Sequence, residues 1–558
     1  MPVTNGFGMM PVTNGFAVMP GILLRLVGAN EDIFRRAGAT QGMAMLLFRR
    51  PFGMVLLLAS VGSALPAADS PPAPSAHALR LVGDEEVHGD GRTPPTIATP
   101  SGIDLGTRDF TLGLSVHTEE RLRDDLGSLL SLWDAHTRHG FHLELANNTG
   151  CTSSQANWRQ LQFGLDAGST PAWRAEGRPG RAVLGFALCV HDGCLYVGTC
   201  ETEGDGEGRV YRYVGPGHWH ALPRLDGSNA VTSLASHEGR LYAATGKYRL
   251  AGSSLPESSN PQRGGRVFRL SSDDQWEPAG ELPDTEAVAG LVHFDGRLYA
   301  SSLYRPAGFF RHEGGRQWTS VPTPHAQRVQ ALTVHDGAIY ASSYDGGKVY
   351  RFDGTDWTDL GLVGQDNTQT YSFAAYGGRL HVGTWPSGRV FRLDPPHTWT
   401  DTGRLGDELE VMALLVHNGS LYGGTLPLGQ VYRYDAGGWT LLKRLDETPD
   451  VKYRRVWTMA TYQGRLFCTT LPSGEIWSLS AGQCVTWDHE FPSGWHDVAA
   501  QRQGGRLRLF VDGRCVAESS GNDAPLALAT GRLKLTVGDG PRGPFLGRLR
   551  KVWLDVAP

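Results

Sequence analysis

The chain has 558 residues, of which 40% are hydrophobic and 73 are glycine, and its formal net charge is −5 at pH 7. This length exceeds one ordinary core and predicts about two to four domains. The glycines follow no collagen period, so they indicate many tight turns rather than disorder. Basic residues are scattered and form no nucleic-acid footprint, which excludes DNA and RNA from the expected partners.

The N-terminal region predicts targeting rather than a folded unit. Residues 1–42, in which PVTNGF occurs twice, are interpreted as an upstream mis-start. Residues 43–67 place Arg49 and Arg50 before an apolar stretch and small residues, the pattern of a secretory signal peptide, with an uncleaved anchor as the alternative. The Pro/Ala-rich stretch 68–95 predicts a linker. No later segment is apolar over a membrane-spanning length, so we expect a secreted, periplasmic or cell-surface protein with no transmembrane segment after cleavage.

From residue 96 apolar and polar residues alternate with the period of half-buried strands. The expected inward-facing residues of three such strands are Phe110, Leu112, Leu114 and Val116; Phe141, Leu143 and Leu145; and Leu161, Phe163 and Leu165. Similar strands return after residue 482, with a hairpin that turns at Asp512-Gly513. Neither 96–180 nor 483–558 holds enough strands for a two-sheet core, so we expect them to form one domain together. Two independent β modules are the alternative, and they would leave bare sheet edges.

The order of motifs in the C-terminal segment carries a family likeness. Trp495-His496-Asp497-Val498-Ala499 is followed by a strand at 507–513, by Gly538-Asp539-Gly540 and by a closing strand. This order resembles the laminin-G-like, concanavalin A-type lectin/glucanase jelly roll, and the N-terminal strands look like the opening strands of that fold. The resemblance implies a two-sheet jelly roll that holds carbohydrate. The Glu-x-Asp-x-x-Glu arrangement of concanavalin-type glucanases is absent.

Residues 181–482 repeat one pattern of four short strands, named A to D within each copy. The copy at 417–440 joins an Asn-Gly turn to a Leu-Tyr strand, a Val-Tyr-Arg strand and a Trp strand. The Leu-Tyr position recurs at Leu195-Tyr196, Leu241-Tyr242, Leu298-Tyr299, Ile339-Tyr340, Leu380-His381, Leu421-Tyr422 and Leu466-Phe467. Trp marks strand D in six copies, while Trp487 either completes a seventh copy or opens the second jelly-roll half. One copy cannot bury a core alone, so the copies must stack.

The strand number and period of these copies resemble a β-propeller blade. Kelch and sialidase-type arrays are loosely similar, with no exact family match. The predicted fold class is therefore all-β: a seven-bladed, or alternatively six-bladed, β-propeller inserted into a two-sheet concanavalin A-like jelly roll. Such an insertion requires that the two ends of the array lie close together, as they do in a closed ring.

The A–B turns are minimal, whereas the B–C and D–A loops on the opposite face carry unusual side chains. Aromatic faces stack on sugar rings, and arginine forks bind carboxylates or sulfates. A closed ring would place these loops around a central concavity, the default ligand site, although a structural role for the same tyrosines is the alternative. The predicted ligand-binding residues, called the loop-face set below, are Tyr248, Arg249, Tyr304, Arg305, Tyr344, Asp345, Trp385, Tyr453 and Arg455.

The signals for catalysis and for metals are weak. A glycosidase needs two carboxyl groups across a sugar, and the candidates are Asp345, Glu201, Asp205 and Asp366. The histidines that open A–B turns occupy a structural position, so no metal site is predicted there: His191, His237, His335 and His417. No cofactor is expected, and the one option left open is calcium at the jelly-roll rim near Asn522 or Asp523. Cys189, Cys194 and Cys200 allow one disulfide or remain buried thiols.

These patterns favour an exported protein that binds carbohydrate or a cell-surface protein through the jelly roll and the loop-rich propeller face. The first alternative is an extracellular glycan-active enzyme, a glycoside hydrolase or polysaccharide lyase, with its site on the same face. The second is a purely structural surface module. No Ser-His-Asp motif, phosphate loop or dinucleotide fingerprint is present, so the sequence leans away from an enzyme without deciding the question.

Overall fold

The computed structural model describes residues 70–147, 158–435, 437–520 and 524–558. The expectations for residues 1–67 and for Asn522 and Asp523 lie outside these ranges. The described chain is all-β, as predicted, and its two helices are the 3₁₀ turns η1 (Leu250–Ser253) and η2 (Pro324–Ala326). In these ranges no helix has the length and apolar character needed to cross a membrane.

Strands from both ends of the described chain form two shared sheets. The seven-stranded sheet has the order β1 (Leu79–Arg80), β40 (Leu546–Val556), β3 (Phe110–Thr118), β36 (Gly494–Gln503), β37 (Arg506–Val511) and β38 (Arg514–Glu518), with β2 (Val87–Asp90) also paired to β40. The five-stranded sheet has the order β35 (Gln483–Trp487), β6 (Arg159–Ala167), β5 (His139–Asn147), β4 (Gly127–Asp134) and β39 (Thr536–Val537).

The two sheets, called the terminal unit, enclose one hydrophobic core. The alternating residues predicted to face inward are buried there together with residues from the C-terminal strands, among them Val498, Leu509 and Leu554. Residues 79–90, which lie within the expected linker, supply β1 and β2 instead, because β40 has a free edge with which they pair. Burial of alternate apolar residues on two facing sheets is what gives the terminal unit a core that neither half could form alone.

Between these two ends the chain forms one eight-stranded sheet and five four-stranded sheets, all antiparallel. The eight-stranded sheet consists of two sets of four strands joined by the pairing of Ala230 with Cys200, so the strands are described as seven groups of four. Groups 1 to 3 are β8 (Ala182–His191), β9 (Cys194–Glu201), β10 (Val210–Gly215) and β11 (His218–Ala221); β12 (Ala230–His237), β13 (Arg240–Gly246), β14 (Arg266–Leu270) and β15 (Trp276–Glu281); and β16 (Val288–Phe294), β17 (Arg297–Ser302), β18 (Phe309–Gly314) and β19 (Gln317–Val321). Groups 4 and 5 are β20 (Leu332–His335), β21 (Ala338–Ser342), β22 (Lys348–Phe352) and β23 (Trp357–Leu362); and β24 (Gln369–Tyr376), β25 (Arg379–Trp385), β26 (Arg389–Asp394) and β27 (Thr398–Arg404). Groups 6 and 7 are β28 (Glu410–His417), β29 (Ser420–Leu426), β30 (Gln430–Asp435) and β31 (Gly438–Arg444); and β32 (Arg455–Tyr462), β33 (Arg465–Leu471), β34 (Ile476–Ser480) and β7 (Ala172–Gly177).

The fourth strand of group 7 comes from the chain that precedes the array. β7 pairs with β34, with Trp173 opposite Leu479 and Gly177 opposite Ile476. The array therefore includes residues before 181, its expected first residue. Trp487 lies in β35 of the terminal unit, and Trp173 is the tryptophan of this fourth strand. A strand added from the other end of the array ties the last group to the start of the first.

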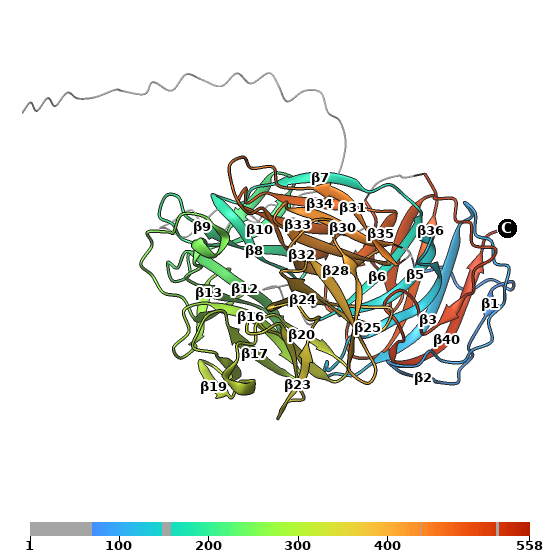
Figure 1. The fold of residues 1–558 in the computed structure, drawn as a ribbon. Coiled ribbons are helices and arrows are strands. Elements are labelled where there is room, and N and C mark those ends of the chain that lie inside the picture. The colour runs from blue at the N-terminus through green and yellow to red at the C-terminus, as the bar shows by residue number, and fades with distance from the viewer. Residues whose placement is uncertain (1–69, 148–157, 436, 521–523) are drawn as a thin grey trace, which may run out of the picture. The chain divides into compact units, whose positions relative to one another are not determined.

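The repeated tryptophans connect neighbouring groups by hydrogen bonds. The indole N–H of Trp318 donates to the carbonyl of Ala279 at 2.9 Å, and that of Trp399 donates to Leu360 at 3.2 Å, in each case on the fourth strand of the preceding group. Trp219 of group 1 likewise donates to Glu176 of β7 at 2.9 Å. The first strands of successive groups lie next to one another (Figure 1), and β32 of the last group lies against β8 of the first.

The A–B turns have the backbone that their sequences predict. Asp192 and Asn418 adopt φ of 45° and 40°, and each is followed by a glycine at positive φ. The predicted hairpin at Asp512-Gly513 has the same form, with φ of 49° and 77°. Two consecutive residues at positive φ suit the twist of a tight antiparallel hairpin.

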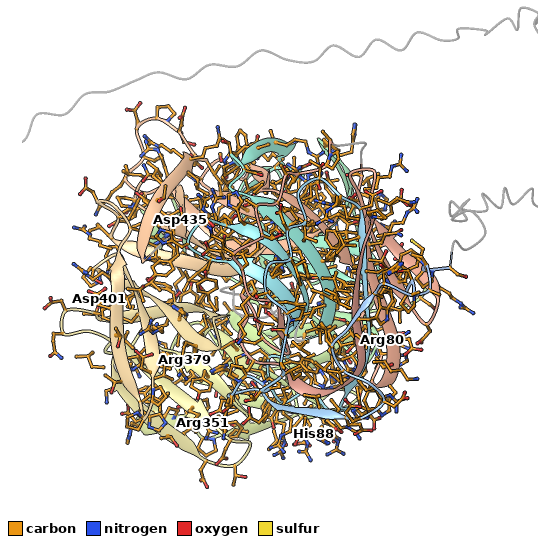
Figure 2. The ribbon with its side chains drawn as sticks, turned by 90° about the vertical axis from the view of Figure 1, so that its right-hand side faces the viewer. Arg80, His88, Arg351, Arg379, Asp401 and Asp435 are labelled. Atoms are coloured by element: carbon orange, nitrogen blue, oxygen red, sulfur yellow. The ribbon has the colours of Figure 1, made fainter. Side chains whose placement is uncertain are left out.

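The A–B turns dock on the outer face of the five-stranded sheet. The amide oxygen of Asn418 accepts a hydrogen bond from His142 Nε2 at 3.1 Å, and its amide N–H donates to the carbonyl of Leu165 at 3.2 Å. The N–H groups of Gly377 and Gly193 donate to Pro541 and Asp488, each at 2.8 Å. In Figure 2 Arg80 and His88 are labelled on the terminal unit, whereas Arg351, Arg379, Asp401 and Asp435 are labelled on the array.

Candidate functional site

The enlarged B–C loop of group 2, residues 247–265, packs against the first strands of several groups. Tyr248 is 6% exposed, and its ring lies 5.0 Å from that of Phe186 and 5.7 Å from that of Trp457. With Tyr371 and Met412 these side chains form one apolar cluster, called the axial cluster, to which first strands of several groups contribute. The concavity expected at this position is therefore filled by aromatic packing.

A buried ion pair lies beside the axial cluster. The Arg455 Nε lies 3.2 Å from Glu410 Oε1, and both side chains are at least nine-tenths buried. Arg455 also donates to the hydroxyl of Ser253 at 2.5 Å, and the same hydroxyl lies 2.5 Å from that of Tyr248. Burial disfavours the charged guanidinium, but Glu410 and the neighbouring tyrosines outweigh that effect and raise the pKa of Arg455. The pair ties group 7 to group 6 and to the loop that covers the axial cluster.

Two arginines of the loop-face set lie at the rim, and both are paired within the chain. The Arg249 guanidinium lies 4.4 Å from the centre of the Tyr304 ring, whose hydroxyl accepts the backbone N–H of Arg249 at 2.9 Å. Arg249 also pairs with Glu286. Arg305 lies 3.0 Å from Asp345. These contacts hold the Tyr304 ring at the surface, half-buried beside exposed positive charge.

Asp345 is bound by a second arginine. Arg328 lies 2.8 Å from its carboxylate and 5.8 Å from the centre of the Tyr344 ring. Burial alone would raise the pKa of Asp345, but hydrogen bonds from Arg328 outweigh it and lower that pKa. Tyr344 packs on Tyr371 with ring centres 4.9 Å apart. The carboxylate is therefore neutralised in place rather than set up as an acid or base.

The last two members of the loop-face set complete the rim. Trp385 is half-buried and packs against the axial cluster. Tyr453 is half-buried as well, with the Arg455 guanidinium 5.8 Å and the Lys452 ammonium 4.8 Å from its ring centre. The structure thus brings the loop-face set into one connected group of contacts: Tyr248 and Arg455 are buried, while the others surround them.

The remaining candidate carboxylates do not form a catalytic pair. Glu201 is 5% exposed and accepts a hydrogen bond from the Tyr211 hydroxyl at 2.9 Å. Asp205 lies 2.7 Å from Arg224 and 3.3 Å from Arg209. Asp366 is exposed on its loop. Glycoside hydrolysis needs two carboxyl groups that face one sugar, and the described residues around the axial cluster show no such arrangement.

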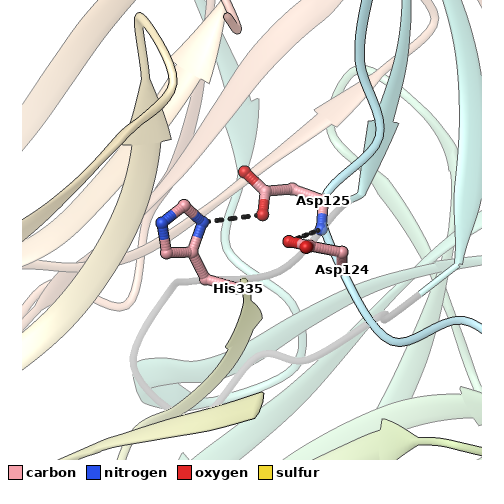
Figure 3. A group of neighbouring side chains, drawn as sticks. All are labelled: Asp124, Asp125 and His335. Carbon is pink, nitrogen blue, oxygen red and sulfur yellow. Dashed lines mark hydrogen bonds and ion pairs between the residues drawn. The ribbon is translucent and has the colours of Figure 1, made fainter. Parts of the chain in front are cut away.

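A group of possible cation ligands lies where the terminal unit meets group 4 (Figure 3). The ligand atoms of Asp124, Asp125 and His335 all lie within 4.8 Å of one another. His335 Nδ1 lies 2.8 Å from Asp125 Oδ1, and Asp124 accepts the N–H of Asp336 at 2.6 Å. Two carboxylates and an imidazole are ligand types that bind divalent cations. Here they already bind one another and link the two parts of the chain.

The contacts in this group shift the pKa values of His335 and Asp124, which was not expected for a histidine of an A–B turn. Burial would lower the pKa of His335, but Asp125 and Asp124 outweigh it and raise that pKa to about 9. Burial and the charge of Asp125 raise the pKa of Asp124 as well. The position of His335 in the repeat is structural, as expected, but its partners come from a segment of the terminal unit that the repeat pattern does not reveal.

The six described cysteines are all unbridged. Cys189 and Cys200 are buried, and burial raises the pKa of both thiols. The disulfide considered among Cys189, Cys194 and Cys200 is therefore not formed in this structure; Cys189 and Cys200 are buried thiols, whereas Cys194 is partly exposed.

A groove that was not predicted from the sequence lies on the outer face of the seven-stranded sheet. Three cavities, of about 420, 290 and 240 Å³, share the side chain of Trp553 as a lining residue. One signal was available: Gly113 interrupts the strand FTLGLSV, and a glycine inside a strand marks close approach of another group. That group is the indole of Trp553, because a Cβ at Gly113 would lie 2.5 Å from its ring.

Comparisons with known proteins found distant structural similarities. No protein-family model matches the chain, and no curated protein matches it. Among solved structures it is similar to virginiamycin B lyase from Staphylococcus aureus, at 9% identity over 56% of this chain and 99% of that one, with a TM-score of 0.45. It is also similar to YCF48 bound to D1 peptide (13% identity, 55% and 97% covered, TM-score 0.41) and to the β-propeller domain of Myceliophteria thermophila Cps50 (Swd1) (12%, 56% and 100%, 0.41). The chain itself is an all-β protein whose array is built from repeated groups of four antiparallel strands.

Proposed function

We propose that the seven groups form a closed seven-bladed propeller inserted into one split jelly roll. The supporting observations are the contact of β32 with β8, the addition of β7 to group 7 and the single core shared by both chain ends. The domain division then runs from about residue 79 for the first jelly-roll half, with β7 transferred to the propeller. A closed ring also brings the two ends of the insertion together, which an inserted domain requires.

The function that this geometry supports best is binding, with glycan as the ligand and the loop face as the platform. The carrying observation is that half-buried Tyr304, Tyr344, Trp385 and Tyr453, from different parts of the array, surround one filled axis. Exposed parts of aromatic rings offer stacking surface to sugars. Arg305 and Arg328 share the single carboxylate of Asp345, and this excess of positive charge favours acidic sugars over neutral ones.

Binding is favoured over catalysis because the site is a shallow platform. The packing of Tyr248 and Trp457 leaves the axis closed, and Glu410 and Asp345 are held by arginines. A stacking platform needs only surface aromatics, whereas a hydrolase needs a cleft with two positioned carboxyl groups. We further propose export by way of the predicted signal peptide, which N-terminal sequencing of the mature protein would check.

A glycan array with the full chain, combined with assay of reducing-end release, tests the proposal. We expect acidic glycans to bind without release, and Tyr304→Ala to weaken binding at least tenfold. Trp495→Ala is the matched control, because Trp495 is also half-buried and carries an arginine on its ring, Arg550 at 4.1 Å, but lies on the terminal unit. Release of reducing ends, or loss of binding in the Trp495 variant alone, would overturn the proposal.

A further inference from the structure

A row of four residues crosses the outer face of the seven-stranded sheet. Trp553 on β40 pairs with Gly113 on β3, Gly113 pairs with Ala499 on β36, and Ala499 pairs with Phe510 on β37. The core side of these strands carries their neighbours Leu112, Val498, Leu509 and Leu554, so the row points away from the core. Two large aromatic side chains therefore stand on either side of a floor made of glycine and alanine.

Polar residues lie along both sides of this apolar row. Gln501 donates to the hydroxyl of Thr111 at 3.3 Å on one side, and Ser115 donates to Asp497 at 2.5 Å on the other. Asp555 on β40 pairs with Thr111 in the sheet register. An apolar trough with polar edges is the form of groove that binds an extended chain, because the edges can bind its backbone.

Residues 71–77, called the strap below, lie over this groove. Pro71 and Pro74 are half-buried, whereas Pro72 and Ala73 between them are exposed. Ser75 anchors the strap, since its N–H and hydroxyl donate to Asp555 at 2.7 and 2.9 Å. The spacing of three residues between half-buried Pro71 and Pro74 matches one turn of a polyproline II segment with one edge toward a surface. Phe510 is only 1% exposed although it faces away from the core, which is consistent with cover by the strap.

The strap does not fill the groove. The cavity of about 240 Å³ is lined by Pro71 and Pro74 together with all four residues of the row. On the other side the cavity of about 420 Å³ is lined by Pro72, Ala73 and Ser75 with Thr111, Gln501 and Trp553. Space therefore remains on both sides of the strap, and the groove has room for a bulkier chain than the strap.

We propose that this groove is a recognition site for an extended proline-rich peptide of another protein, and that the strap occupies it in cis. The bound segment would place two prolines three residues apart against Trp553 and Phe510, as the strap places Pro71 and Pro74. Aromatic walls suit proline rings, and a preformed polyproline II chain loses little conformational entropy on docking. The site is separate from the loop face and does not depend on glycan binding.

The test measures fluorescence anisotropy of a labelled peptide with the sequence of residues 70–77, SPPAPSAH, added to the full chain. In the native chain the tethered strap competes at a high effective concentration. Replacing Pro71→Gly and Pro74→Gly weakens the strap, so this variant is expected to bind the peptide at least tenfold more tightly than the native chain. The matched control, Pro72→Gly with Ala73→Gly, alters the exposed strap residues and is expected to change binding less than threefold.

Two further measurements make the outcome decisive. Trp553→Ala in the strap-weakened chain should abolish peptide binding while thermal unfolding shows an intact fold. The peptide SGPAGSAH, which lacks the two spaced prolines, should not bind the strap-weakened chain. This comparison of peptides does not require a substitution at Trp553. No binding by the strap-weakened chain, equal binding of both peptides, or displacement of the strap by an oligosaccharide instead would overturn the proposal.

Discussion

The two outer faces of the terminal unit contrast in both chemistry and exposure. The five-stranded sheet turns polar side chains outward, His142, Glu144, Gln160 and Gln162, yet each is at most 1% exposed because the A–B turns cover them. The seven-stranded sheet turns the aromatic pair Trp553 and Phe510 outward, under a strap with space on both sides.

This contrast shows how each face can be used. On the covered face, buried polar groups are hydrogen-bonded: Arg542 lies 2.7 Å from Glu144, and Gln160 donates to Asp488 at 2.8 Å. Burial of charge is tolerated only with such partners, so this face specifies one docking geometry. The open face makes few obligatory polar contacts, and its occupant can be exchanged. The carbohydrate-holding role implied by the jelly-roll resemblance therefore has no access to the five-stranded sheet.

The largest expected effect is on the covered face. Glu144→Ala should lower the free energy of unfolding by about 3–5 kcal/mol, because it leaves the buried Arg542 without its partner. Burial raises the pKa of Glu144, but Arg542 and His142 outweigh it and lower that pKa to about 2. The stabilisation is therefore complete above the ordinary value of 4.5 and is lost as the pH falls from there toward 2. Urea unfolding across this pH range measures it.

The control for this prediction lies on the edge of the open sheet. Glu518 pairs with Arg508 and Arg506, each at 2.8 Å, but the three side chains are partly exposed. Glu518→Ala should cost about 0–1 kcal/mol, as exposed ion pairs do. Equal losses for the two variants would contradict the distinction between a covered and an open face.

The second effect concerns pH at the junction with group 4. The pKa of His335 is raised to about 9, so its stabilisation is complete below the ordinary value of 6.5 and is lost as the pH rises toward 9. We expect the native chain to lose about 2 kcal/mol over this interval, allowing for partial exposure, and His335→Ala to remove that loss. Thermal unfolding between pH 6 and 10 is the measurement, over a range that brackets both of the pKa values.

His191 provides the matched control, since it occupies the same position in group 1. Burial lowers the pKa of His191, so its contribution is lost as the pH falls below its ordinary value rather than as the pH rises. His191→Ala should therefore leave the alkaline loss unchanged. A flattened alkaline profile in this variant would assign the pH dependence to the turns in general instead of to Asp124 and Asp125.

The third effect tests the floor of the open groove. Gly113→Val places a Cβ 2.5 Å from the present position of the Trp553 ring, so the indole must shift. We expect a loss of about 1–3 kcal/mol in the free energy of unfolding, the usual cost of overpacking, and weaker peptide binding in the strap-weakened chain. Gly215→Ala meets nothing within 4 Å and should be nearly neutral. A stable Gly113 variant with unchanged peptide binding would show that Trp553 takes no part in peptide binding.

The smallest effect concerns the strap anchor. Asp555→Asn weakens two exposed hydrogen bonds to Ser75, so the free energy of unfolding should change by less than about 1 kcal/mol. Limited proteolysis between residues 71 and 78 should nevertheless become several-fold faster, because the strap leaves the sheet more often. Asp497→Asn, on the same face but with its carboxylate bound to Ser115 instead of Ser75, should leave the cleavage rate unchanged.

Several features followed directly from local sequence. The alternation at Phe110–Val116 predicted which side chains enter the core, because strand geometry sends successive residues to opposite faces. The Asx-Gly turns predicted their positive φ, and the recurring Leu-Tyr and Trp positions predicted the four-stranded groups. The loop-face set was predicted from the same regularity, and its role in ligand binding stays a prediction.

Other features depended on contacts between distant residues. Trp173 looked like part of the first half until its strand paired with β34, across roughly three hundred residues of chain. The predicted central concavity is filled by Phe186, Met412 and Trp457, whose direction toward the axis depends on how first strands of different groups meet. His335 likewise meets Asp124 and Asp125 only because the terminal unit docks on the A–B turns.

The sequence by itself determined the all-β class, the repeat, its turns and the inward face of each strand, because these depend on neighbours a few residues apart. The tertiary structure decided which polar face was covered, which aromatic face stayed accessible and whether the axis was open. The polarity of a side chain determines which hydrogen-bond partners it needs. Whether water or another part of the chain supplies them depends on how the array docks on the terminal unit. That is why His142 and Glu144 are buried while Trp553 borders open space.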